Sequence, residues 1–184
     1  MISSVAYLPD GQQLATSSSD GIVKLWSAGD GKCVNNLAGH GRSVRAVAYH
    51  PDGQQLATAS YDNTVRLWNP RTGNHILTLA GHESGVRSVV FSPDGQQLAT
   101  GSADGIVKLW NSATGECIHT FKAHKSGVWS VTYRPDGQQL ATGSADRTVK
   151  IWSTTNGKCV STLQRQKAWV ISVIYSKDGL QFSK

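Results

Sequence analysis

The 184-residue chain is 39% hydrophobic and 16% charged, a composition that suits an ordinary globular protein able to bury a core. No stretch approaches the roughly 18 apolar residues of a membrane span, and no basic and apolar leader opens the chain, so we expect a cytoplasmic protein without a membrane segment. The net charge is +6, but most basic residues stand singly, which argues against nucleic acid as the partner.

Four unrelated features of the sequence recur every 42 residues. Asp-Gly pairs begin at Asp10, Asp52, Asp94, Asp136 and Asp178, and tryptophans stand at Trp26, Trp68, Trp110 and Trp152. Glycines recur at Gly31, Gly73, Gly115 and Gly157, and Gln-Gln-Leu-Ala-Thr recurs at 12–16, 54–58, 96–100 and 138–142. Because chance would not give unrelated residues one period, the chain holds about 4.4 copies of one unit.

The copy that starts at Gly85 predicts four short strands and no helix. In chain order they are residues 86–92, 98–102, 106–110 and 117–121. The first ends at Pro93-Asp94-Gly95, where proline presets a turn and glycine supplies a positive φ. The second is closed by Ala103-Asp104-Gly105, which has the composition of a hairpin turn. β-branched and aromatic residues fill the strands, and no segment has a helical period.

Each predicted sheet is apolar on both faces, because Val107 and Leu109 point one way while Trp110 points the other. Such sheets must stack at about 10 Å, and their twist turns the stack around an axis. We therefore predict an all-β propeller segment that forms an incomplete ring. Its four blades are predicted at 1–40, 41–82, 83–124 and 125–166, with the start of a fifth at 167–184.

The motif residues resemble the WD-repeat β-propeller family over the whole chain. In the second copy they are Gly39-His40, the Pro-Asp-Gly turn, Leu-Ala-Thr-x-Ser-x-Asp62 and Val-Arg-Leu-Trp68. The residue after each tryptophan is Ser27, Asn69, Asn111 or Ser153, never the aspartate of the family's name, but that column is tolerant in such families.

The resemblance implies a buried hydrogen-bonded set of His, Thr, Asp and Trp in each complete blade. The three sets are His40, Thr58, Asp62 and Trp68; His82, Thr100, Asp104 and Trp110; and His124, Thr142, Asp146 and Trp152. A buried imidazole needs partners for both nitrogens, and the indole N–H is only a donor, so such a chain satisfies every member. The first copy has Thr16, Asp20 and Trp26 without a histidine, and the fifth has Arg165-Gln166 where Gly-His stands elsewhere.

Two columns could suggest chemistry. His40 and Asp62 could act as a catalytic base and its orienting group, but a site used once does not need three copies, so we expect a structural role and no enzymatic activity. Cys33, His75, Cys117 and Cys159 could suggest a metal or disulfide set. They are predicted in separate blades, too far apart for a disulfide or a zinc site, so we expect no metal and no cofactor.

A third column is basic and consists of Lys24, Arg66, Lys108 and Lys150 in the third strands. A solvated row whose stems cover apolar neighbours is the interpretation that we favour. A stripe that tracks phosphates is the alternative, although the four residues lie on successive blades rather than along one groove.

Repeat positions whose residue differs between copies are candidates for partner recognition. Equivalent packing requires the same residue in every copy, whereas recognition of a partner requires different residues. The second residue of the first strand and the residue before the hairpin aspartate vary most, and in the family they face the narrow end where partners dock. Our candidate partner-binding residues are Arg45, Tyr61, Arg87, Trp129 and Trp169. These residue types are enriched at binding hot spots, although the aromatics could instead cover strand ends.

We therefore expect a non-catalytic scaffold that binds a protein or peptide. The alternatives are a basic surface for nucleic acid and a truncated fragment of a larger signalling or regulatory protein. An unclosed arc would expose an apolar sheet face at each end, so the chain is expected either to belong to a longer protein or to self-associate through its open ends.

Overall fold

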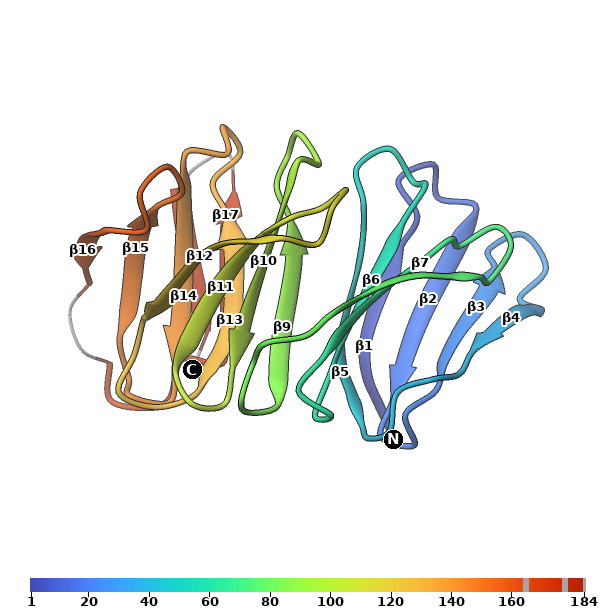
Figure 1. The fold of residues 1–184 in the computed structure, drawn as a ribbon, viewed down its shortest axis with the longest axis horizontal. Coiled ribbons are helices and arrows are strands. Elements are labelled where there is room, and N and C mark those ends of the chain that lie inside the picture. Colours follow the sequence, from blue (N-terminus) through green and yellow to red (C-terminus); the bar gives the residue numbers. More distant parts are fainter. Residues whose placement is uncertain (164–165, 177–178, 184) are drawn as a thin grey trace. The chain divides into compact units, whose positions relative to one another are not determined.

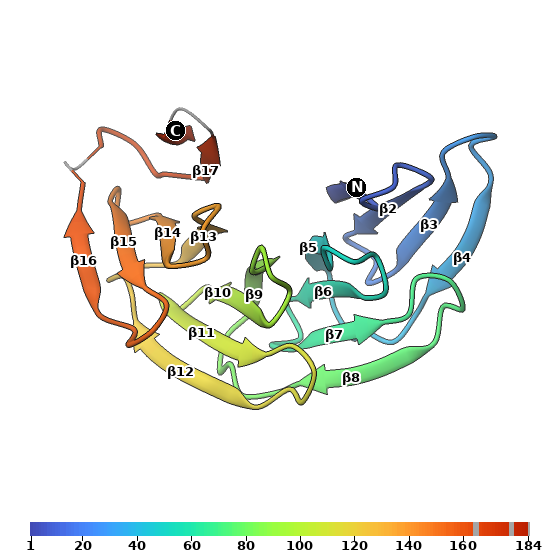
Figure 2. The same ribbon diagram turned by 90° about the horizontal axis from the view of Figure 1, so that it is seen from above.

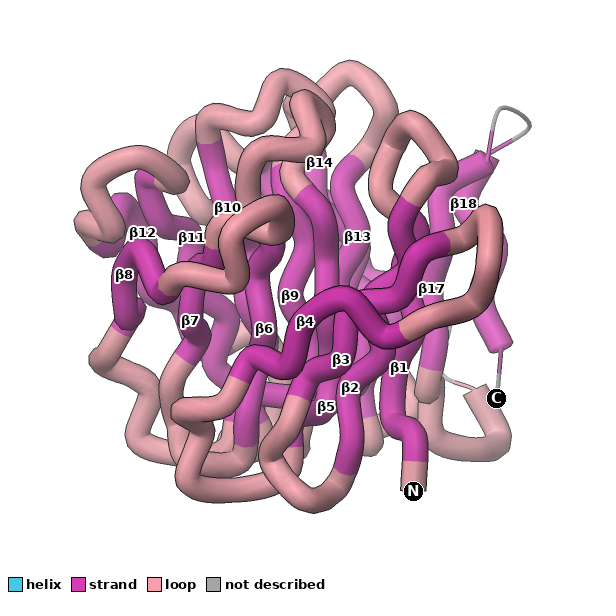
Figure 3. The backbone as a smooth tube through the Cα atoms, turned by 90° about the vertical axis from the view of Figure 1, so that its right-hand side faces the viewer, coloured by secondary structure: helices cyan, strands magenta, loops and turns pink. Residues whose placement is uncertain are grey.

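The computed structural model describes residues 1–163, 166–176 and 179–183, and all regular structure in this part of the chain is β-strand (Figure 3). The chain divides into two compact units, Met1–Val89 and Val90–Lys184, which are described separately. The described residues include no helix that could span a membrane. Arg165 and Asp178, which the sequence assigned to the fifth copy, lie outside the described residues.

The first unit contains two antiparallel four-stranded sheets, each in chain order (Figures 1 and 2). One consists of β1 (Ile2–Tyr7), β2 (Gln13–Ser18), β3 (Val23–Ser27) and β4 (Cys33–Leu37). The other consists of β5 (Val44–Tyr49), β6 (Leu56–Ser60), β7 (Val65–Trp68) and β8 (His75–Leu79).

The rest of the chain repeats this plan. A third sheet consists of β9 (Val86–Phe91), through which the boundary between the units passes, with β10 (Gln97–Ser102), β11 (Ile106–Asn111) and β12 (Cys117–Lys122). A fourth consists of β13 (Val128–Tyr133), β14 (Gln139–Ser144), β15 (Val149–Ser153) and β16 (Cys159–Thr162). The pair β17 (Ser172–Ser176) and β18 (Gly179–Ser183) follows. The repeated four-stranded sheets confirm the predicted all-β class, while the blade limits drawn from the repeat stay predictions.

The turns form where the sequence places Asp-Gly. Between β5 and β6, Gly53 has a φ of 73°, and the Asp52 carboxylate accepts a hydrogen bond from the Gln54 N–H at 2.7 Å. In the left-handed region glycine has no Cβ to clash, which explains its use there. Between β7 and β8 the register shifts at Leu67/Trp68, so a bulge twists the outer strand beside the tryptophan.

Packing between sheets buries the apolar face of each third strand. In the first unit Val23 and Leu25 lie in one core cluster with Val44 and Leu56 of the next sheet, and all four are fully buried. In the second unit the equivalent Val107 and Leu109 pack with Val128 and Val131. The two-faced sheets therefore pack against each other within each unit, as their alternation predicted.

Candidate protein-interaction surface

The histidine set of the second sheet is assembled by three elements of the first unit. His40 precedes β5, Thr58 lies in β6, and Asp62 follows β6. The His40 imidazole lies 2.7 Å from Asp62 through Nδ1 and 2.7 Å from Thr58 Oγ1 through Nε2. Trp68 Nε1–H donates to the same threonine oxygen at 2.9 Å. The set thus joins the segment before β5 to the β6–β7 hairpin.

The fourth sheet has the same arrangement in the second unit. His124 lies 3.0 Å from Asp146 through Nδ1 and 2.7 Å from Thr142 Oγ1 through Nε2. Trp152 Nε1–H donates to Thr142 at 2.9 Å. The Lys125 backbone N–H also donates to Asp146, at 3.1 Å, so the carboxylate holds the segment that leads to β13.

In the third and first sheets the indole N–H again donates to the threonine of the same sheet. In the third sheet Trp110 donates to Thr100 at 2.9 Å, and Asp104 accepts from Ser102 and from the Ile106 N–H. His82 belongs to the first unit, whereas the rest of its set belongs to the second. In the first sheet Trp26 donates to Thr16 at 2.9 Å, while Asp20 is exposed.

Burial lowers the pKa of both His40 and His124. It is the main cause that lowers the pKa of His40, although the Asp62 carboxylate opposes it. Burial acts to raise the Asp62 pKa, but hydrogen bonds from Thr64 and His40 lower it to about 2. The side chains of His40 and His124 are 1% and 0% exposed, so a substrate has no access to either imidazole. This geometry supports a structural role.

The cysteine column lies on the outer strands. Cys33, Cys117 and Cys159 are exposed and free, each at the first residue of its strand. Each Sγ contacts the backbone carbonyl two residues later in its own strand, at 3.6, 3.5 and 3.5 Å respectively. Among the residues that the structure describes, no three His, Cys, Asp or Glu side chains gather in a way that could hold a metal ion.

The lysines of the basic column lie over their own sheets. The ammonium groups of Lys24, Lys108 and Lys150 are 5.8, 5.8 and 5.6 Å from the ring centroid of the tryptophan two residues later. Lys108 also donates to Thr120, and Lys150 to the Ala123 carbonyl. These cation–π and hydrogen-bond contacts engage the charges within the sheets, which weakens the case for a phosphate-binding stripe.

Three of the five candidate partner-binding residues meet in the first unit. The guanidinium carbons of Arg45 and Arg87 lie 5.2 and 5.9 Å from the ring centroid of Tyr61. Tyr61 is held at the start of β5 because its N–H donates to the Ser43 carbonyl at 2.9 Å. A Cβ on Gly85 would lie 2.4 Å from the Tyr61 ring, so only glycine fits at that position. We call Arg45, Tyr61 and Arg87 the arginine–tyrosine cluster.

The other two candidates meet in the second unit. The rings of Trp129 and Trp169 are stacked, with centroids 6.2 Å apart and planes inclined by 20°. Trp169 is 57% exposed. Its segment is held to the β14–β15 hairpin because the Gln166 N–H donates to the Arg147 carbonyl at 2.8 Å and the Val170 N–H to the Ser144 carbonyl at 3.0 Å. Backbone contacts therefore present an aromatic surface to solvent.

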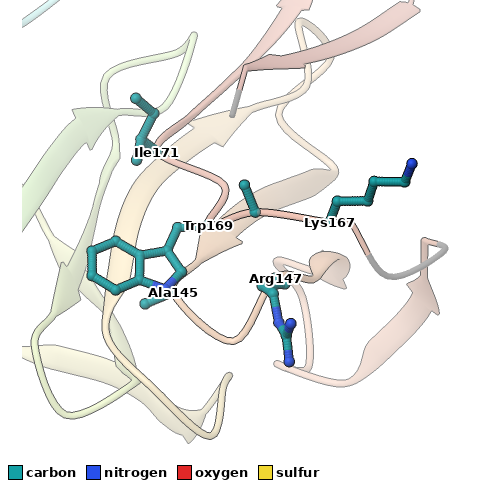
Figure 4. Close-up of a pocket in the computed structure, with 6 residues that line it drawn as sticks. Ala145, Arg147, Lys167, Trp169 and Ile171 are labelled. Atoms are coloured by element: carbon teal, nitrogen blue, oxygen red, sulfur yellow. The ribbon is translucent and has the colours of Figure 1, made fainter.

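Beside this stack lies a solvent-open pocket of about 600 Å³ (Figure 4). It is lined by Ala145, Arg147, Lys167, Ala168, Trp169 and Ile171, and we call this set the tryptophan pocket. Figure 4 shows the indole beside Ala145, while Arg147 and Lys167 extend away from it in different directions. Both cations are exposed, and the adjacent Asp146 is engaged by His124. The pocket therefore combines an apolar wall with a positive rim.

Arg147 and Lys167 were not among the residues singled out from the sequence. The sequence does mark Arg147 as unusual, because it follows the hairpin aspartate at a position where two other copies have glycine. It has a φ of 71°, a left-handed conformation that few residues other than glycine, asparagine and aspartate adopt. An arginine in that column is a departure that packing does not require.

The comparisons with known proteins agree with this architecture. Residues 44–182 match the family model described as the second β-propeller of the echinoderm microtubule-associated protein, and residues 1–27 match the model of the WD domain, G-beta repeat. A stretch of 32 residues is 56% identical to WD repeat-containing protein 86 from Homo sapiens, over 17% of this chain and 8% of that protein. The chain thus corresponds to a small part of that relative's length. From the repeated four-stranded sheets and the family match over most of its length, the chain belongs to the WD-repeat β-propeller family.

Proposed function

We propose that this chain is a non-catalytic interaction module that binds a protein or peptide partner at the sheet ends where the first strands begin. WD-repeat propellers generally mediate protein interactions and are typically non-catalytic. The finer assignment is to the arginine–tyrosine cluster of the first unit and the tryptophan pocket of the second. It includes all five residues that the sequence singled out for partner binding.

The observation that carries the proposal is the exposed aromatic surface at the tryptophan pocket. An exposed aromatic ring leaves apolar area in contact with water, and such exposed apolar area is typical of interaction sites. Trp169 is 57% exposed while its ring stacks on Trp129. Tryptophan and arginine are the residue types that dominate binding energy at interfaces. A pocket of about 600 Å³ is in the size range of sites that accept a side chain or small ligand.

The chemistry of the pocket indicates a partner with an apolar side chain close to a carboxylate. Ala145, Ile171 and the Trp169 ring offer the apolar wall, and Arg147 and Lys167 offer positive charge. Arginine can bind a carboxylate through two parallel hydrogen bonds, which favours an acidic peptide over a basic one. In the first unit Arg45 and Arg87 add positive charge beside Tyr61, so both sites have the same preference.

A peptide display library tests this proposal. We expect the chain to enrich peptides in which an aromatic or aliphatic residue lies near Asp or Glu, and the Trp169→Ala variant to bind them at least about tenfold more weakly, as for a hot spot worth 1.4 kcal/mol or more. Ile118→Ala is the matched control, because Ile118 is an exposed residue of β12 outside both sites. Equal binding by Trp169→Ala and the parent chain would contradict the assignment of the pocket.

The nucleic-acid alternative predicts a different outcome. Oligonucleotide binding whose affinity falls steeply with salt, and which Trp169→Ala leaves unchanged, would favour a phosphate-binding surface. Since the lysines of the basic column lie over their own tryptophans, we expect only weak binding of this kind.

A further inference from the structure

The first strand of the first sheet exposes two side chains whose counterparts are buried elsewhere. Val5 and Tyr7 on β1 are 59% and 64% exposed. One repeat later, Val47 is 7% exposed and Tyr49 is half-buried. Val131 and Tyr133 of β13, and Val173 of β17, are also buried. The β1 face is thus built like the others, but nothing in the described chain buries it to the same extent.

Within each unit, the preceding sheet covers this face in the same way. In the first unit Val47 packs in a cluster with Val23 and Leu25, and Tyr49 Oη donates to Gln13 Oε1 at 2.8 Å. In the second unit Val131 packs with Val107 and Leu109. There Tyr133 Oη donates to Gln97 Oε1 at 3.4 Å. The tyrosine of one sheet therefore pairs with the glutamine of the sheet before it.

A backbone contact also joins the first strands of neighbouring sheets in both units. The Val47 N–H donates to Ser4 Oγ at 3.4 Å, and the Val173 N–H donates to Ser130 Oγ at 3.2 Å. The serine lies on the first strand of the preceding sheet. The serine and the glutamine stand at fixed places of the repeat: Ser4 and Gln13 on the first sheet, Gln97 on the third and Ser130 on the fourth.

The β17–β18 pair carries an exposed copy of that covering face. Gln181 follows Gln13 and Gln97 at whole multiples of the 42-residue step, and Ser172 follows Ser4 and Ser130 in the same way. Both are exposed, and Ile174, which pairs with Gln181 in the register, is 56% exposed. The opposite face of β17 is occupied, since Val173 packs with Val149 and Ile151 of the fourth sheet. The chain therefore presents one uncovered face and one covering face.

We propose that a second copy of this chain covers the β1 face with its β17–β18 face, in a head-to-tail contact. In this contact Tyr7 Oη donates to Gln181 Oε1 of the second copy, and the Val5 N–H donates to its Ser172 Oγ. Ile174 of the second copy packs over the β1 face. None of these five side chains is charged, so no like charges oppose the contact. The proposal is independent of the peptide-binding function.

A head-to-tail contact joins two different faces, so it either closes into a ring or continues into an open assembly. Sedimentation velocity of the 184-residue chain between about 1 and 100 µM tests for it. We expect species heavier than the 19.7 kDa of one chain, with a mass that rises with concentration. A chain that remains a single 19.7 kDa species throughout would overturn the proposal.

Complementary variants test which faces meet. Tyr7→Asp disables the β1 face and Ile174→Asp the β17–β18 face, so each variant alone should be monomeric. Mixed, they retain one intact face of each kind and should form a 1:1 dimer of twice the single-chain mass. Tyr7→Phe, which removes only the hydroxyl, should weaken self-association about fivefold, as expected for one hydrogen bond.

Several outcomes would overturn the head-to-tail contact. Self-association that persists in Ile174→Asp means that β1 faces pair with each other, and a mixture that stays monomeric excludes the complementary pairing. Ile76→Asp is the matched control, because Ile76 is a 47% exposed residue of β8 outside both faces. This variant should self-associate like the parent chain. Circular dichroism checks folding, and Gln181→Lys is a second block of the same face if Ile174→Asp does not fold.

Discussion

The first and second sheets of the first unit have nearly the same sequence but differ in how deeply it is buried. In both, the indole N–H donates to a threonine on the neighbouring strand at 2.9 Å. Trp26 of the first sheet is only half-buried and lacks a histidine partner, whereas Trp68 of the second is 3% exposed and belongs to the His40 set. The repeat therefore determines the hydrogen bonds within a sheet, while neighbouring segments determine how deeply its side chains are buried.

Replacing the tryptophans should give the largest difference between the two sheets. Trp68→Ala is expected to lower the free energy of unfolding by about 3–5 kcal/mol, because it leaves a cavity in a packed core. Trp26→Ala should cost about half as much, since part of its surface is already in water. Urea unfolding of both variants measures the difference. Equal losses would mean that the first sheet is as well packed as the second.

The histidine set offers a sharper contrast. His40→Ala removes one hydrogen-bond partner from Asp62 and one from Thr58 and should lower the free energy of unfolding by about 1–3 kcal/mol. Asp20→Ala, at the equivalent of Asp62 in the first sheet, should change it by less than about 0.5 kcal/mol because Asp20 is exposed. Urea unfolding of both variants measures the difference in the free energy of unfolding. A large loss from Asp20→Ala would contradict the view that the histidine makes the carboxylate important.

Replacing valines of the first strands tests whether a neighbouring sheet covers each of these strands. Val47→Ala should cost about 1.6 kcal/mol, the value of two buried methylene groups at about 0.8 kcal/mol each. Val5→Ala should cost less than about 0.5 kcal/mol at a concentration where the chain is monomeric. Matching losses from the two variants would show that β1 is covered within a single chain.

Acidification should affect the second sheet in two separate steps. Burial lowers the pKa of folded His40, so below about pH 6.5 the unfolded chain binds the proton more readily and stability falls as the pH drops. The Asp62 pKa of about 2 lies below its ordinary 3.8, so its contribution is complete above that value and is lost only as the pH falls toward 2. Melting temperatures at pH 7, 6 and 5 follow the first step.

His124 contributes in the same direction, because burial lowers its pKa as well. The His40→Ala, His124→Ala double variant should therefore lose much of the stability change between pH 7 and 5. An unchanged slope in the double variant would assign the pH dependence to other groups.

Much of the fold was predictable because it is local. The Pro-Asp-Gly turns and the alternation of Val107 and Leu109 act over a few residues, and with the 42-residue step they predicted repeated four-stranded sheets. The bulge at Leu67/Trp68 was not predictable, because it depends on the register between two strands and not on either alone.

The candidate site was predictable only as a set of columns. The sequence treated five residues as one surface, and the structure brings Arg45, Tyr61 and Arg87 together in one unit and Trp129 with Trp169 in the other. It also adds Arg147 and Lys167 to the second group. Column positions say at which end of a sheet a residue lies but not which neighbour its side chain contacts.

From the amino-acid order alone follow the repeat, the turns and the two apolar faces, since these depend on residues close in sequence or on a fixed step, whereas the histidine sets followed from the family resemblance. Tertiary structure decided which of them are buried and which side chains meet. The Trp169 stack requires hydrogen bonds from Gln166 and Val170 to the β14–β15 hairpin, and the exposure of Val5 depends on which sheet lies against it. Contacts between segments distant in the chain carry no local pattern, so only the folded chain reveals them.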